Sequence, residues 1–237
     1  MAARLFGRMG RHRKLHDRYF KRAKREGYLA RSAYKLLEIQ ERRGVIRRGD
    51  TVLDLGCYPG SWLQVAAEIV GARGAVVGID LEETGHDFGP NVRTARGDFT
   101  RTDPAGLLGM VGGDGGAERF DVVLSDMAPS TTGHGDHFHS TRLCESILDA
   151  LPGLLGTGGN CVMKVLEGEA FPDLLARTRG LFDEAGALKP GACRDVSRET
   201  YVVALGYRPG RASSRDPGDG ASDAAGPMPR PRAGWGS

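Results

Sequence analysis

The sequence predicts an α/β fold in which a mostly parallel sheet is covered by helices on both faces. The first observation is that strand patterns and helix patterns alternate along residues 49–207, as they do in parallel sheets. The second is that the apolar strings at 52–62 and 120–129 each run into Gly, Pro or Asp residues. Ligands of open α/β sheets bind at the carboxyl ends of the strands. The two strings therefore predict a binding site at one edge of the sheet.

The individual elements follow from apolar runs separated by turn residues. Short runs rich in Val, Ile and Leu predict strands at 51–55, 75–80, 92–95, 120–125, 160–165 and 200–206. Longer segments between them predict helices at 61–71, 102–111, 140–155 and 171–186. The last strand is expected to run antiparallel, and the glycine-rich residues 112–116 are interpreted as a flexible loop.

Composition divides the chain into three parts. Residues 1–48 hold 16 Lys and Arg against four Asp and Glu, so they carry +12, whereas the rest of the chain carries −9. This segment, which includes helix-compatible residues 17–43, is expected to attract a polyanion such as RNA. A solvated Arg-rich tail and a mitochondrial transit peptide are the alternatives. Residues 49–207 hold the alternating pattern, and residues 208–237 lack apolar periodicity and are predicted to be disordered.

Length and cysteine usage exclude several classes of protein. The 237 residues suffice for one domain with a full core. No apolar run approaches the ~18 residues of a membrane span. The four cysteines lie far apart without C-x-x-C spacing, which argues against a zinc site or a disulfide framework and fits a reducing compartment. We expect a cytoplasmic protein, or a mitochondrial one if the source is eukaryotic.

Three carboxylates stand where successive strands end. Asp54 ends the first strand, before the tight turn Gly56-x-x-Pro-Gly60. Asp80 ends the second strand, where a carboxylate can bind a ribose diol, and Asp98 follows the third and can meet an adenine amino group. Because the dinucleotide pattern G-x-G-x-x-G is absent, a ligand with nucleoside and amino-acid parts is favoured. Each Asp taken singly also fits a helix cap or a turn.

Four further charged residues predict the reactive part of the site. Asp126 ends the fourth strand. Lys164 lies in an apolar strand, where an ammonium group needs a partner. Lys35 lies on the N-terminal helix and Glu199 opens the last strand. Taken singly, Lys35 and Glu199 also fit ordinary salt bridges.

With these residues the chain resembles the FtsJ/RrmJ (RlmE) ribosomal RNA 2′-O-methyltransferases, from about Tyr19 to Gly206. The shared motifs are R-S-A-Y-K-L around Lys35, D-L-G-x-x-P-G-x-W at 54–62, I-D-L at 79–81, G-D-F at 97–99, S-D-M-A-P at 125–129, K-V-x-x-G-E-x-F at 164–171 and S-R-E-x-Y at 197–201. The resemblance implies a Rossmann-like class I fold and S-adenosylmethionine (SAM) as cofactor. The catalytic tetrad that it implies is Lys35, Asp126, Lys164 and Glu199. The SAM contacts that it implies are Gly60, Trp62, Asp80, Asp98 and Asp126.

The activity that the resemblance implies is methylation of a ribose 2′-hydroxyl in large-subunit ribosomal RNA. The implied acceptor is a uridine of the peptidyl-transferase A loop, in free rRNA or in the assembled large subunit. The alternatives are a 2′-O-methyltransferase for tRNA or another RNA, and a non-enzymatic ribosome-assembly factor that binds RNA. The chain departs from the family at Tyr58, Ser61 and Ser130. We expect a monomer that binds no membrane.

Lys164 is the residue expected to act as general base or to stabilise the emerging alkoxide. The hydroxyl must lie in line with the methyl group and the sulfur of the cofactor. Lys35 and the sulfonium would favour loss of the Lys164 proton, whereas Asp126 and Glu199 would oppose it. The sequence leaves both roles open.

The RNA contacts are expected in the basic segment. The expected phosphate contacts are Arg13, Lys14, Arg18, Lys21, Arg22, Lys24 and Arg25. Tyr19, Tyr28 and Tyr34 lie among them and are expected to stack on an exposed base, although Tyr34 also fits packing against the sheet. The segment from His134 to His139 holds three imidazoles and a carboxylate. We expect no metal there, but a solvated loop that touches RNA.

Overall fold

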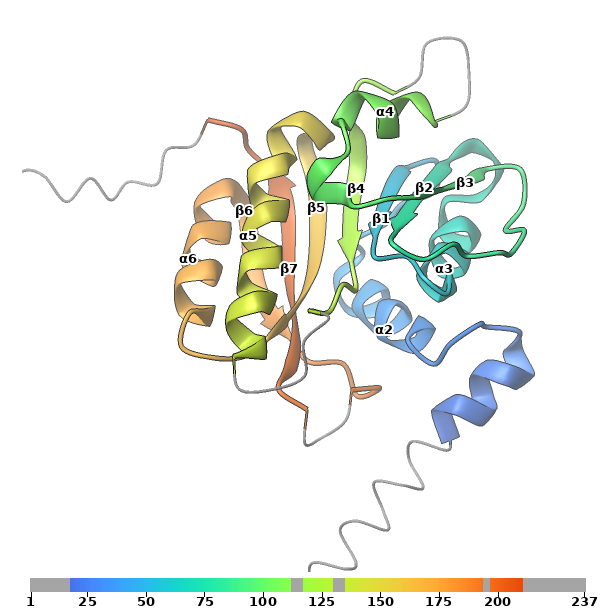
Figure 1. The fold of residues 1–237 in the computed structure, drawn as a ribbon, viewed down its shortest axis with the longest axis horizontal. Helices are drawn as coiled ribbons and strands as arrows, with labels where there is room; N and C mark the ends of the chain where they lie inside the picture. Colours follow the sequence, from blue (N-terminus) through green and yellow to red (C-terminus); the bar gives the residue numbers. More distant parts are fainter. Residues whose placement is uncertain (1–17, 112–116, 130–134, 194–196, 211–237) are drawn as a thin grey trace, which may run out of the picture.

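A seven-stranded sheet forms the centre of the protein in the computed structural model (Figure 1). The structure describes residues 18–111, 117–129, 135–193 and 197–210. The strands are β1 (Thr51–Leu55), β2 (Ala75–Asp80), β3 (Val92–Arg96), β4 (Phe120–Ser125), β5 (Leu155–Leu166), β6 (Phe182–Leu188) and β7 (Glu199–Tyr207). Their order in the sheet is β3-β2-β1-β4-β5-β7-β6. β1 to β5 are parallel, and β7 is antiparallel to both β5 and β6.

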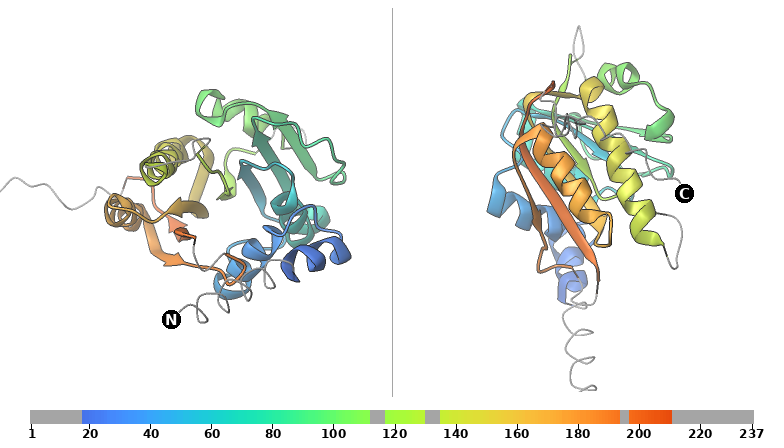
Figure 2. Two further views of the ribbon diagram at one scale, coloured as in Figure 1. Left: turned by 60° about the horizontal axis from the view of Figure 1, so that its bottom comes forward. Right: turned by 90° about the vertical axis from the view of Figure 1, so that its left-hand side faces the viewer.

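Helices cover both faces of this sheet. They are α2 (Ala33–Arg43), α3 (Ser61–Val70), α4 (Pro104–Gly109), α5 (Asp136–Leu154) and α6 (Phe171–Leu181), with short 3-10 turns at Gly71–Arg73 and Phe99–Arg101. Residues 18–26 form one more helix, which precedes α2. In the right-hand view of Figure 2, α5 and α6 lie on one side of the sheet and α2 on the other. The predicted fold class is confirmed, including the antiparallel last strand.

The alternation of side chains along the strands builds two apolar cores. Leu53 and Leu55 of β1 pack with α4, α5 and α6 on one face, whereas Val52 packs with α2 and α3 on the other. This follows from the two-residue period of a strand, which sends neighbouring side chains to opposite faces. Because α2 contributes the fully buried Leu36 and Ile39 to the second core, the end of the basic segment is packed on the sheet.

Three predicted boundaries are wrong. The strand predicted at 160–165 begins five residues earlier, at Leu155, directly after α5. The helix predicted at 171–186 ends at Leu181, and the edge strand β6 begins at the next residue. Exposed acidic and small residues dominate β6, so its sequence lacks the apolar alternation of a typical strand. The segment predicted as a loop from His134 is helical from Asp136 onward. Other predictions lie outside the described residues: the phosphate contacts of Arg13 and Lys14, the loop at 112–116, the departure from the family at Ser130 and the tail beyond Gly210.

The order of the strands places the site. Chain order in the sheet reverses between β1 and β4, and such a switch point leaves a crevice at the carboxyl ends of the strands. The carboxyl end of β4 points toward α2 in Figure 1. Among the described helices, none is long and apolar enough to cross a membrane.

Candidate active site

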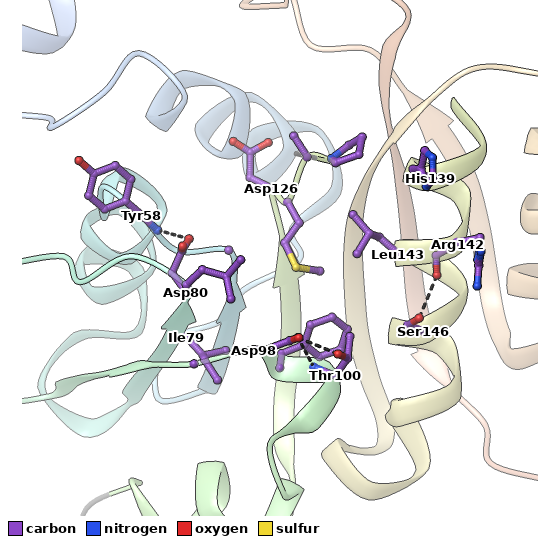
Figure 3. A pocket seen from close by; sticks show the side chains of 17 residues that line it. Tyr58, Ile79, Asp80, Asp98, Thr100, Asp126, His139, Arg142, Leu143 and Ser146 are labelled. Carbon is purple, nitrogen blue, oxygen red and sulfur yellow. Dashed lines mark hydrogen bonds between the residues drawn. The ribbon is translucent and has the colours of Figure 1, made fainter. Parts of the chain in front are cut away.

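A cavity of about 590 Å³ opens at the carboxyl ends of the parallel strands. Asp80 from β2, Asp98 after β3 and Asp126 after β4 line it, as the sequence predicts. Figure 3 shows α5 as the opposite wall. This wall is formed by His139, Arg142, Leu143 and Ser146. The cavity therefore joins three strand-end carboxylates to a wall on α5, which is not predicted from the sequence.

Main-chain amides hold the Asp80 carboxylate in place. Its Oδ2 accepts a hydrogen bond from the Tyr58 N–H at 2.9 Å, and its Oδ1 accepts one from the Glu82 N–H at 3.0 Å. Each oxygen of an ionised carboxylate can accept a second hydrogen bond. Asp80 is therefore an oriented acceptor, suited to the two hydroxyls of a ribose.

Asp98 is held in the same way by the turn that follows β3. Its Oδ1 accepts from the Thr100 hydroxyl at 2.7 Å and from the Thr100 N–H at 3.0 Å. These hydrogen bonds hold the pKa of Asp98 below its ordinary value because they stabilise the charged form. Asp98 thus presents an ionised acceptor to the cavity.

The turn after β1 brings two loops close together at the cavity. Gly56 has φ +76°, and a Cβ atom there would lie 2.4 Å from Cγ of Met127. Glycine is therefore required for the approach of the β4 loop. Gly60 has φ +111°, and the Phe88 ring occupies the place that a Cβ atom would take. Gly60 and Trp62 are not among the residues that line the cavity, so their predicted cofactor contacts stay predictions.

Trp62 and Ser61 join α3 to α2. The buried Trp62 indole donates a hydrogen bond to the Ser32 carbonyl at 2.9 Å. The hydroxyls of Ser61 and Ser32 lie 2.7 Å apart and share a hydrogen bond. Ser61, where the chain departs from the family, thus links the N-terminus of α3 to that of α2. α2 is the helix that carries Lys35.

The four residues of the predicted tetrad meet as two ion pairs. Lys35 pairs with Glu199, with side chains 8% and 16% exposed. Lys164 Nζ lies 3.0 Å from Asp126 Oδ1 and also donates to the Asp126 carbonyl. The residues come from α2, β5, β7 and the end of β4, so the tetrad exists only in the folded chain.

Tyr201 connects the two ion pairs. Its hydroxyl lies 2.7 Å from Asp126 Oδ1 and 2.8 Å from Glu199 Oε1. Its ring packs on Trp62, with centroids 5.7 Å apart. The sequence predicts no role for Tyr201, although residues two apart on a strand share a face and Glu199 belongs to the predicted tetrad.

Burial and charge act against each other at this cluster. Burial alone would raise the pKa of Glu199, but the Lys35 ammonium and the hydrogen bonds from Lys35 and Tyr201 outweigh it, so this pKa lies below the ordinary value. Asp54 lies nearby, fully buried, and neither carboxyl oxygen has a hydrogen-bond partner among the described residues. Burial first, then the charges of Asp126 and Asp80, raise the pKa of Asp54 well above its usual value. Asp54 therefore lies beneath the site without a hydrogen-bond partner among the described residues, and it does not line the cavity.

The basic helix at 18–26 differs from what the sequence predicted. Tyr34 is 5% exposed and packs edge-on against Tyr28. The Tyr34 hydroxyl donates to Glu26 at 2.8 Å, and Arg22 lies over the Tyr34 ring while pairing with Glu26. Tyr34 is therefore unavailable for base stacking. It packs against Ala23 of the helix at 18–26 and against Ala192, and not against the sheet. The exposed aromatic of this helix is Phe20, at 63% exposure, which the sequence analysis did not single out.

The histidine segment forms the first turn of α5. His137 packs against Gly168, and His139 lines the cavity. Across the residues that the structure describes, no three His, Cys, Asp or Glu side chains lie together as a metal site would need. His134 lies outside these residues.

An α/β sheet with strand-end acids around a cavity, beside a Lys-Asp-Lys-Glu cluster, fits a methyltransferase of the SAM-dependent class. The profile of the FtsJ-like methyltransferases matches residues 28–207, so the chain belongs to the FtsJ-like methyltransferase family. Its cofactor is accordingly SAM, and the oriented acceptors at Asp80 and Asp98 fit the nucleoside part of that cofactor.

Individual relatives agree with this assignment. A ribosomal RNA large subunit methyltransferase E of Syntrophobacter fumaroxidans is 44% identical over 196 residues, covering 82% of this chain and 97% of that protein. The crystal structure of a ribosomal RNA methyltransferase from Plasmodium falciparum superimposes with a TM-score of 0.63 at 27% identity, covering 76% and 98% of the two chains. Aeropyrum pernix fibrillarin with bound SAM shares the fold, with a TM-score of 0.51 at 18% identity and coverage of 73% and 76%.

Replacing Asp80 is expected to weaken SAM binding. Asp80→Ala removes a charge-assisted acceptor, a loss of about 1.5–3 kcal/mol in binding free energy. Calorimetric titration with SAM measures this loss. Asp87→Ala is the control, because Asp87 is an exposed residue of the same loop and caps a turn outside the cavity lining. Unchanged SAM affinity in folded Asp80→Ala protein would exclude Asp80 as a ribose ligand.

Proposed function

We propose that this protein transfers a methyl group from SAM to the 2′-hydroxyl of a ribose in large-subunit ribosomal RNA, at a uridine of the peptidyl-transferase A loop. The observation that carries the proposal is the position of Asp126. It lines the cofactor cavity and also pairs with Lys164 at 3.0 Å. A hydroxyl that approaches the transferable methyl group at this end of the cavity would therefore lie close to Lys164. The names of the relatives support large-subunit rRNA as the acceptor class.

The proposed catalytic roles follow from the geometry of the two pairs. SAM supplies an electrophilic methyl group on its sulfonium. Lys164 takes the proton of the attacking hydroxyl or holds the negative charge that develops on its oxygen. Asp126 orients Lys164, because both its side chain and its carbonyl contact Nζ. Lys35, held by Glu199, adds a fixed positive charge beside the reacting oxygen.

The helix at 18–26 provides the proposed grip on RNA phosphates. Lys21, Lys24 and Arg25 are exposed. Lys24 and Arg25 follow Lys21 by three and four residues, so both lie on the same side of the helix as Lys21. Arg22 pairs with Glu26 at 2.9 Å and also lies over the Tyr34 ring. Arg25 makes a longer contact with the same carboxylate, at 3.3 Å, and its side chain is 76% exposed. Phe20 is exposed on the same helix and is the proposed platform for an unpaired base.

Removal of these three charges is expected to weaken RNA binding in a salt-dependent way. The triple variant Lys21→Ala, Lys24→Ala, Arg25→Ala should flatten the slope of log affinity against log salt by about 2–3, because each phosphate contact contributes about 0.7–0.9. Fluorescence anisotropy with an rRNA fragment at several salt concentrations measures the slope.

A triple variant of equal charge serves as the control. Arg47, Arg73 and Arg119 are exposed and precede β1, β2 and β4, at the edge of the sheet away from the site. Their replacement by Ala should leave the slope close to that of the wild type. Equal slopes for both triple variants would show that the helix does not hold the RNA.

The acceptor class is tested by methyl transfer from labelled SAM to three substrates. These are undermethylated large ribosomal subunits, free large-subunit rRNA and tRNA. We expect incorporation into the large subunit or its rRNA, followed by mapping to one nucleotide. Efficient labelling of tRNA alone would replace the proposed acceptor with the alternative one. Binding without transfer to any of the three would favour an assembly factor.

A further inference from the structure

The Tyr201 hydroxyl stands between two carboxylates of the tetrad. It lies 2.7 Å from Asp126 Oδ1 and 2.8 Å from Glu199 Oε1, and the residue is fully buried. In the sheet, Tyr201 of β7 is the register partner of Lys164 of β5. The hydroxyl is therefore fixed by the strand pairing itself, beside the lysine expected to act on the substrate.

A phenol has one proton to donate and two carboxylates within reach. Burial, then the charges and hydrogen bonds of Asp126 and Glu199, raise the pKa of Tyr201 well above its usual value. The phenol consequently stays protonated wherever the enzyme works and can only donate. A hydrogen bond given to Asp126 takes up part of the negative charge that would otherwise act on Lys164.

We propose that Tyr201 is a positioning residue for methyl transfer: its hydroxyl donates a hydrogen bond to Asp126 Oδ1, so that Lys164 releases its proton more readily. This inference rests on the proposed function, since it concerns how Lys164 receives the proton of the ribose hydroxyl. Tyr201 does not line the cofactor cavity and acts through Asp126.

Each element packed around the hydroxyl contributes a charged or titratable group. The groups are Asp126 after β4, Lys164 of β5, Glu199 of β7, Lys35 of α2, Cys193 before β7 and Asp54 of β1. Lys35 neutralises Glu199 and lies 5.8 Å from the Tyr201 ring centre. Burial is the first cause that raises the pKa of both Cys193 and Asp54, and it disfavours the charged form of each. Tyr201 therefore affects Lys164 mainly through Asp126, by weakening the electrostatic attraction between the Asp126 carboxylate and the Lys164 ammonium.

The sign of the effect follows from this charge arrangement. Without the hydroxyl, the full charge of Asp126 acts on the Lys164 ammonium at 3.0 Å. The proton is then held more tightly, so the rate rises only at higher pH. Below that rise the rate falls in proportion to the smaller neutral fraction, and at high pH it returns toward that of the wild type.

The test compares Tyr201→Phe with Tyr207→Phe in the full-length protein. Tyr207 is a matched control: it is a buried tyrosine of the same strand that packs on Phe182, and among the described residues its hydroxyl has no hydrogen bond. Single-turnover rates with saturating large-subunit RNA are measured from about pH 6 to about pH 10. SAM affinity and melting temperature are measured in parallel.

We expect Tyr201→Phe to lose about tenfold in rate near neutral pH. The rising limb of its profile of rate against pH should shift by about one unit to higher pH. SAM affinity should stay within a few-fold, and Tyr207→Phe should match the wild type. An unshifted limb in Tyr201→Phe overturns the inference, whether the rate is normal or uniformly lowered. If instead the wild type methylates no ribose hydroxyl, the proposed function itself has failed.

A second variant covers the case in which Tyr201→Phe does not fold. Incorporation of 3-fluorotyrosine at position 201 keeps the hydroxyl and the shape of the ring but makes the phenol a stronger hydrogen-bond donor. The limb should then move to lower pH, opposite to the phenylalanine variant. An unshifted limb, or a shift to higher pH, also overturns the inference.

Discussion

Lys164→Ala should lower the single-turnover rate of methyl transfer by about 10²–10⁴, the range typical of a lost general base. Loss of charge stabilisation at the attacking oxygen would add to this. SAM affinity should stay within a few-fold, because Lys164 is not among the residues that line the cavity. Rates with saturating RNA substrate separate the chemical step from binding.

Lys164→Arg distinguishes the two roles of this lysine. A guanidinium does not release its proton at working pH, and its planar fork cannot reproduce the two contacts of Nζ with Asp126. We therefore expect the arginine variant to fail as well. Near-native turnover of Lys164→Arg would leave Lys164 only a fixed positive charge. Near-native turnover of Lys164→Ala would remove it from the mechanism altogether.

Glu199→Gln should destabilise the folded protein by about 3–5 kcal/mol, because it leaves the buried Lys35 ammonium without a counter-charge. Restoring neutrality with the double variant Lys35→Met, Glu199→Gln should recover most of this loss. Urea denaturation at neutral pH measures both free energies of unfolding. A double variant less stable than Glu199→Gln alone would show that Lys35 does not depend on Glu199.

The same pair predicts how stability responds to acid. The folded-state pKa of Glu199 lies below 4.5, its ordinary value. The unfolded chain therefore binds this proton more readily than the folded one. The stabilisation is fully present above about pH 4.5 and is lost as the pH falls through the lower folded-state value. Glu199→Gln should show a weaker loss of stability over that range.

The strands around the cavity could be predicted from sequence because their signals are local. β1, β2 and β4 are runs of apolar residues; β1 is followed by Gly56, β2 ends on Asp80 and β4 ends on Ser125, and their predicted bounds agree with the structure. β6 could not be predicted in this way. It begins directly after α6 without a turn, and as an edge strand it has only one neighbour to pair with, β7.

The candidate site likewise has a part that could be predicted from the sequence and a part that could not. Asp80, Asp98 and Asp126 follow strands, so topology alone brings them to one edge. The bridge from Tyr201 to Asp126 joins residues 75 positions apart, and it depends on the register of β7 against β5. The burial of Tyr34 depends on how the helix at 18–26 packs on α2. Such contacts between distant segments have no signature in a single sequence.

The atom that receives the methyl group is the most direct test of the account. Undermethylated large subunits would be incubated with SAM and either the wild type or Lys164→Ala, and the digested nucleosides would be analysed by mass spectrometry. The account predicts one additional 2′-O-methyluridine with the wild type and none with the variant. A methyl group on a base atom, or the same ribose methylation by Lys164→Ala, would contradict it.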